Sequence, residues 1–175
     1  NLTEIVTRSW TEGFYSKPRV DFELLEQYSE GLIALSACLA GEIPRALSAN
    51  DYAGAKEAAL RYDTIFGHGN FYIEIQDHGL PEQKRILPAL ITLSRETGIP
   101  LVATNDCHYI RKEDSRMHKV LLCIQTNHTI DEENSLEFGS QEFYYKTEEE
   151  MRALFPQCPE AVDNTGVIAD QCEVE

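Results

Sequence analysis

The distribution of hydrophobic and polar positions along the chain predicts three strands. Residues 31–38 are nearly continuous in apolar character, which is typical of a strand covered on both faces, as in a parallel sheet. Residues 71–78 alternate between apolar and polar positions, which predicts a strand with unlike faces. Residues 100–109 begin as a short apolar run behind Gly98 and end in a polar cluster. We expect a buried strand there, whose last residues emerge into a site.

Stretches of helical period lie between and after these strands. The stretch 44–66 is interrupted near its middle, so we expect two helices there, the second capped by Asn50 or Asp51. Thr147 and Glu150 form the pattern of a capping box. The other expected helices span residues 1–16, 21–28, 81–97, 113–126, 147–155 and 159–172. The apolar residues expected to face inward from the 113–126 helix are Met117, Val120, Leu121 and Ile124.

This alternation of strands and helices predicts an α/β fold. Strand, helix and strand in succession imply parallel strands with right-handed crossovers. In barrels and open sheets of this class, sites lie beyond the carboxyl ends of the strands. The expected strand ends carry Cys38, then Gln76 and His78, then Asp106 and His108. These side chains should therefore lie along one edge of the sheet.

The pair Asp106 and His108 is the strongest candidate for chemistry. Residues two apart on a strand point to the same side, so a carboxylate and an imidazole would project together. Such a pair makes part of a divalent-metal site or an acid/base pair, whereas the alternative is a turn-fixing Asp beside a solvated His. Cys38 could be a thiolate ligand, although spacing alone favours a small buried residue. His78 could contact a ligand, or could cap the turn before Pro81.

A cluster of basic residues follows Asp106 directly. It could hold a phosphate or a nucleic-acid strand beside the metal. The alternative is a solvated helix face paired with Glu113 and Asp114. The residues of this cluster are Arg111, Lys112, Arg116 and Lys119.

Composition limits the classes of function. The chain has 175 residues, a one-domain length, with 15 basic and 30 acidic residues and a formal net charge of -15. Such a surface repels polyanions, so broad electrostatic binding of duplex DNA by this chain alone is not expected. Five cysteines without a C-x-x-C pair fit a reducing cytoplasm, and no apolar run approaches membrane-spanning length. Because the first residue is Asn1, we expect a piece of a longer protein.

Four blocks of sequence resemble the alpha subunits of bacterial DNA polymerase III: residues 31–42, 71–80, 102–109 and 118–125. The resembling region is the later part of the amino-terminal PHP (polymerase and histidinol phosphatase) domain. The resemblance implies an incomplete, distorted β/α barrel, the carboxyl-terminal part of a seven-stranded barrel with divalent metals at its carboxyl rim. It implies one partial PHP domain over residues 1–175, mostly helical from about residue 140, where it leads toward the next domain.

The resemblance also implies site residues. The family's cysteine ligand falls on Cys38, and its late aspartate and histidine ligands fall on Asp106 and His108. The family's earlier ligands, a His-x-His pair among them, would precede the first residue. The chain should therefore lack a full metal cluster, and no catalytic base can be named. Carboxylate, imidazole and thiolate together favour zinc, with manganese or iron as alternatives. The candidates for substrate or phosphate contact are His78, Arg111 and Lys112.

The implied parent is a replicative DNA-directed DNA polymerase, in which the intact PHP domain supports metal-dependent 3′–5′ exonuclease proofreading. Its implied partners are DNA, through the full-length polymerase, and other replicase subunits, in the cytoplasm and away from membranes. The chain alone should be inactive, and open sheet edges could pair two copies. Two alternatives stay open. One is a non-catalytic PHP scaffold that braces the polymerase or docks a partner, and the other is a stand-alone PHP phosphoesterase.

Overall fold

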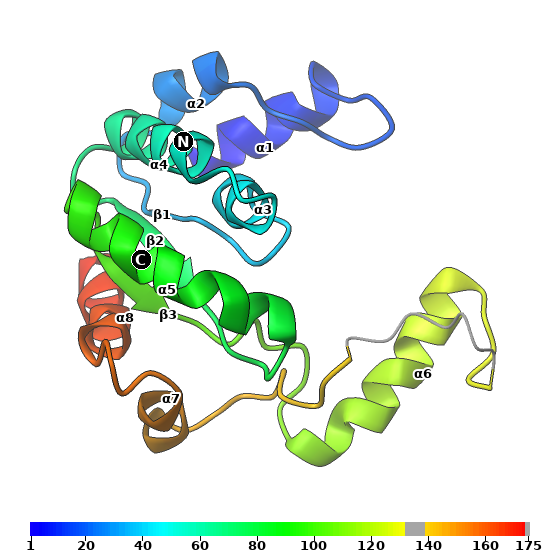
Figure 1. The fold of residues 1–175 in the computed structure, drawn as a ribbon. Helices are drawn as coiled ribbons and strands as arrows, with labels where there is room; N and C mark the ends of the chain where they lie inside the picture. The colour runs from blue at the N-terminus through cyan, green and yellow to red at the C-terminus, as the bar shows by residue number, and fades with distance from the viewer. Residues whose placement is uncertain (132–138, 174–175) are drawn as a thin grey trace.

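The computed structural model describes residues 1–131 and 139–173 and contains a parallel three-stranded sheet with helices around it (Figure 1). The strands are β1 (Ala34–Leu35), β2 (Phe71–Ile75) and β3 (Leu101–Ala103). The helices are α1 (Leu2–Thr11), α2 (Phe22–Tyr28), α3 (Glu42–Ser48), α4 (Tyr52–Phe66), α5 (Pro81–Thr97), η1 (Lys112–Asp114), α6 (Ser115–Thr126), α7 (Glu148–Leu154) and α8 (Glu160–Gln171).

The sheet has the strand order β1-β2-β3, and both pairs of neighbours are parallel. Ala34 lies opposite Phe71 in the first pair, and Ile73 lies opposite Leu101 in the second. Helices α3 and α4 connect β1 to β2, and α5 connects β2 to β3, because parallel neighbours need a crossover. This confirms the predicted α/β class. Closure into a seven-stranded barrel stays a prediction.

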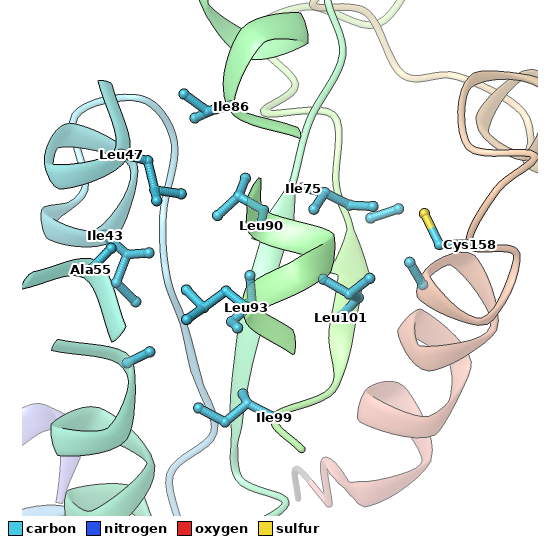
Figure 2. Close-up of a cluster of buried hydrophobic side chains, with 14 of the residues drawn as sticks. Ile43, Leu47, Ala55, Ile75, Ile86, Leu90, Leu93, Ile99, Leu101 and Cys158 are labelled. Atoms are coloured by element: carbon cyan, nitrogen blue, oxygen red, sulfur yellow. The ribbon is translucent and has the colours of Figure 1, made fainter. Parts of the chain in front are cut away.

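The hydrophobic core lies between the sheet and helices α3, α4 and α5, while α8 packs against β3. Figure 2 shows Ile43 and Leu47 of α3 on the side toward which Leu90 and Leu93 of α5 point. Burying one such aliphatic side chain stabilises the fold by about 1.5–3 kcal/mol. The core therefore holds the sheet and its crossover helices in a fixed arrangement.

The helix ends follow the signals in the sequence. The carboxylate of Asp51 accepts the backbone N–H of Gly54 at 2.9 Å, so α4 begins at the predicted break within residues 44–66. At α7 the predicted capping box is present. The Thr147 hydroxyl accepts the Glu150 N–H at 3.3 Å, and the Glu150 carboxylate accepts the Thr147 N–H at 2.8 Å.

The first strand differs from its prediction. The strand expected over residues 31–38 is reduced to β1, because Ala37 has a left-handed φ of 66° and the chain turns there. Leu35 is 39% exposed, so the prediction that this strand is covered on both faces is wrong. In the described parts of the chain β2 is its one neighbour, and pairing of two copies through its outer edge stays a prediction.

The two faces of β2 differ in the polarity of their side chains, as predicted, but both faces are largely buried. Tyr72 and Gln76, on the polar side of the alternation, are buried along with the apolar side. The polar side of β2 therefore lies in the interior, at the point where the sheet's carboxyl edge begins.

Helix α6 corrects a further prediction. Met117, Leu121 and Ile124 were expected to face inward, yet they are 64%, 61% and 72% exposed. Cys123 is the buried residue of this helix, which extends away from the sheet (Figure 1). Helical period predicts that an apolar face exists, but a neighbouring element must be present to cover it.

Candidate metal site at the carboxyl edge of the sheet

Asp106 and His108 come together where the chain leaves β3. The His108 Nε2 and Asp106 Oδ1 atoms are 3.6 Å apart, and both residues are exposed. The predicted reason for this proximity was wrong. The strand ends at Ala103, and Asp106 has a left-handed φ of 42°, so a loop rather than an extended strand brings the pair together.

His118 joins this pair from the second turn of α6. Its ring centroid lies 5.2 Å from that of His108 and 5.5 Å from that of Tyr109. Burial lowers the pKa of His118, and the nearby His108 lowers it further. The sequence did not predict that His118 lies beside His108. The turn between His108 and α6 has no regular repeat from which the relative positions of the two rings could be inferred.

A segment distant in sequence supports the loop. The Asn105 side-chain amide donates to the carbonyl oxygens of Glu142 at 2.8 Å and Tyr144 at 2.6 Å. The His108 backbone N–H donates to the Phe143 carbonyl at 2.8 Å. Residues 142–146 contribute an isolated parallel bridge between Tyr109 and Tyr144. The loop that carries Asp106 and His108 is therefore held by this one segment both before and after Asp106.

His78 is placed in the interior, where it is 1% exposed. Its Nε2 lies 2.9 Å from the Asn105 carbonyl and its Nδ1 lies 2.8 Å from the Gln83 amide nitrogen. The neutral ring that donates to Asn105 and accepts from Gln83 satisfies both bonds. The ring also stacks on Phe143, with 3.9 Å between centroids, and burial lowers the pKa of His78. These contacts favour a structural role, and its contact with substrate or phosphate stays a prediction.

Cys38 is half-buried and lines a cavity of about 20 Å³ together with Glu74 and Gln76. Within residues 1–131 and 139–173, no three His, Cys, Asp or Glu side chains form a group that could hold a metal ion. The structure thus brings Asp106 and His108 together, whereas Cys38 lines the small cavity beside Glu74 and Gln76. The ligand role of Cys38 stays a prediction.

One residue of the basic cluster, Lys112, forms an ion pair with a carboxylate from a distant segment of the chain. The Lys112 ammonium binds the carboxylate of Glu142, which raises the pKa of Lys112 and lowers the pKa of Glu142. Lys146, whose side chain is almost fully buried, binds the same carboxylate at 2.9 Å. Arg111 is exposed, and its backbone N–H donates to Asp114 at 3.0 Å. Phosphate binding by Arg111 and Lys112 stays a prediction.

Comparison with known proteins identifies the family. The family model of the PHP domain matches residues 1–78. The chain is 49% identical over 174 residues to DNA polymerase III subunit alpha of Treponema pallidum, and 49% identical over 179 residues to that of Thermus aquaticus. The chain is therefore related, over nearly its whole length, to the amino-terminal region of bacterial DNA polymerase III alpha subunits.

These relatives are much longer than the chain. The match covers 99% of this chain and 15% of the Treponema alpha subunit, and 100% of this chain and 14% of the Thermus alpha subunit. The alpha subunit of Deinococcus radiodurans is 46% identical over 178 residues. The PHP match includes Cys38 and ends at His78, so Asp106 and His108 lie in the part shared with the alpha subunits alone.

The described helices include none that combines the length and the apolar character needed to cross a bilayer.

Proposed function

We propose that this chain is part of a replicative DNA-directed DNA polymerase and contributes ligands to a divalent-metal site that supports 3′–5′ exonuclease proofreading. The observation that carries the proposal is the 3.6 Å approach of His108 Nε2 to Asp106 Oδ1 at the carboxyl edge of a parallel sheet. Sites in α/β proteins lie at this edge. The similarity to polymerase alpha subunits over nearly the whole chain supports the polymerase context.

The donor atoms fit part of such a site. Carboxylate oxygen and imidazole nitrogen are both ligands for zinc and manganese. Asp106 and His108 would hold the metal, Cys38 would be a further ligand, and the remaining ligands would come from outside the described residues. A bound metal would supply an activated water and stabilise charge at phosphorus. The chain's own residues orient the ligands, since Asn105 and Phe143 fix the loop that carries them. The chain alone should be inactive.

Metal content tests this proposal. Elemental mass spectrometry would be applied to this chain and to the full alpha subunit that contains it. Each would be measured as the wild type and as the single variants Asp106→Ala and His108→Ala. The matched control is His68→Ala, because His68 also lies beside an aspartate, 3.3 Å from Asp63, but at the end of α4. We expect two or more metals in the full subunit, lost in the Asp106 and His108 variants and retained in the control. Absence of metal from the full subunit would refute the metal site.

A nuclease assay tests the proofreading step separately. The full subunit would be given single-stranded DNA and a mismatched primer end with the metal present. Loss of 3′ nucleotides that disappears in the Asp106→Ala variant would support proofreading. Bound metal with intact DNA would reject it and favour the second candidate function.

The second candidate is a scaffold that braces the polymerase or docks another replicase subunit. The exposed apolar residues Met117, Leu121 and Ile124 of α6 favour it, because a large exposed apolar patch commonly marks an interaction surface. A stand-alone PHP phosphoesterase has less support, since the chain spans about 15% of the length of the relatives it matches.

A further inference from the structure

Glu74 is hydrogen-bonded to the ends of all three strands. Its backbone N–H donates to the Ser36 hydroxyl at 2.8 Å, directly after the last residue of β1. Its carboxylate Oε1 accepts the Gln76 side-chain amide at 2.9 Å and also accepts the Thr104 hydroxyl. The Gln76 amide is shared with the Thr104 hydroxyl at 3.1 Å. One carboxylate thus connects β2 to the chain leaving β3, and its own backbone connects to the chain leaving β1.

Two of the three partners of Glu74 precede a proposed metal ligand by two positions. Ser36 precedes Cys38, and Thr104 precedes Asp106. Because only one residue separates the members of each pair, fixing the positions of Ser36 and Thr104 restricts where the side chains of Cys38 and Asp106 can lie. Glu74 itself lines the small cavity that Cys38 also lines.

The orientation of Gln76 depends on Glu74. The Gln76 Oε1 atom is buried and has no hydrogen-bond partner among residues 1–131 and 139–173. Within these residues the amide is therefore held by the groups to which its nitrogen donates. Those acceptors are the Glu74 carboxylate and the Thr104 hydroxyl, and Thr104 is in turn held by Glu74. Removing the Glu74 carboxylate would leave the bond between the Gln76 amide and the Thr104 hydroxyl, but would remove the acceptor that holds both side chains against β2.

We propose that Glu74 is a positioning residue for the metal ligands: its hydrogen bonds to Ser36, Gln76 and Thr104 set the strand ends from which Cys38 and Asp106 follow. The inference rests on the proposed metal site, because it needs a metal whose binding the geometry affects. Residues outside the ligand shell that orient ligands change metal affinity by roughly 10–100-fold when they are removed.

The test uses the full alpha subunit that contains this chain, with Co²⁺ as the probe. Glu74→Leu removes the acceptor, whereas Glu74→Gln keeps an oxygen that can accept from Gln76 and Thr104. The control is Glu96→Leu, since Glu96 also accepts a hydrogen bond, from Lys56 at 2.8 Å, but at the end of α5. We measure the Co²⁺ dissociation constant, the visible absorption of bound Co²⁺ and the thermal midpoint of each variant.

We expect Glu74→Leu to weaken Co²⁺ binding by about 10-fold or more and to change the absorption spectrum. Glu74→Gln should bind like the wild type, and so should Glu96→Leu. A purely structural role for Glu74 would lower the thermal midpoint without changing the spectrum of the metal that is bound. If Glu74→Leu fails to fold, Thr104→Val replaces it, because valine has the shape of threonine and lacks the bonded hydroxyl.

The outcomes separate the two proposals. If Co²⁺ binding is lost in Asp106→Ala but unchanged in affinity and spectrum in Glu74→Leu and Thr104→Val, the positioning role is refuted and the metal site stands. If the wild-type subunit binds no Co²⁺, both are refuted.

Discussion

Replacing His78 by Phe tests the strongest structural claim about the interior of this edge. Phenylalanine keeps a planar ring that can stack on Phe143, so the change isolates the two hydrogen bonds of the imidazole. It leaves the Asn105 carbonyl and the Gln83 amide without their partners. A buried polar group left unpaired costs about 1–3 kcal/mol, so the loss of partners for two such groups should lower the free energy of unfolding by roughly 2–6 kcal/mol.

Urea unfolding followed by circular dichroism measures this change. His68→Phe is the control, because the side chain of His68 is 70% exposed, and its change should stay within about 0.5 kcal/mol. A double-mutant cycle with Gln83→Leu should show a coupling free energy of about 0.5–3 kcal/mol between positions 78 and 83. A loss below about 0.5 kcal/mol for His78→Phe at neutral pH would refute the claim that both nitrogens are bonded in the folded protein.

The pH dependence of the same variant gives an independent check. Burial lowers the pKa of His78 below its ordinary value of about 6.5, against the opposing effects of the Asn105 carbonyl and Asp106. The unfolded chain therefore takes up a proton first as the pH falls. Stability is lost from about pH 6.5 down to the lower pKa of the folded state, by at most about 1.4 kcal/mol per pH unit. The wild type should lose its advantage over His78→Phe in that window. His118 titrates in both proteins and cancels in the difference.

Two further predictions concern stability. Leu93→Ala in α5 should lower the free energy of unfolding by about 2–5 kcal/mol, because Leu93 is fully buried. Leu121→Ala on the exposed face of α6 should change it by less than about 0.5 kcal/mol. Equal losses for the two variants in urea unfolding would contradict the exposure of α6. Asp51→Ala should cost about 0.5–2 kcal/mol by removing the cap of α4, and Asp51→Asn should restore most of it, as thermal unfolding would show.

Much of the fold was predictable because its signals are local. Pro81 at the start of α5 and Gly98 after its end, with a left-handed φ of 75°, delimit the predicted 81–97 helix. Asp51 and Thr147 cap the helices that follow them, as predicted. The alternation of strands and helices implied parallel pairing, which the sheet shows. Each of these features depends on residues within a few positions of one another.

The proximity of Asp106 to His108 was also predicted from their spacing, although by a different local geometry. What surrounds them was not predictable. His118 reaches His108 only because the chain turns at η1, and Asn105 is held by carbonyls more than thirty residues away. The Glu142 carboxylate that binds Lys112 likewise comes from a distant segment. Spacing within one stretch carries no information about which distant stretch lies beside it.

The sequence by itself therefore determined the order of helices and strands, the parallel α/β class, the ends of α5 and the capped starts of α4 and α7. Only the tertiary structure decided that α6 exposes Met117 and Leu121, that β1 is short and partly exposed, and that His78 is fully buried. The physical reason is the same in each case. Periodicity states which side chains share a face, but burial and hydrogen bonding depend on the element that packs against that face, and only folding brings that element there.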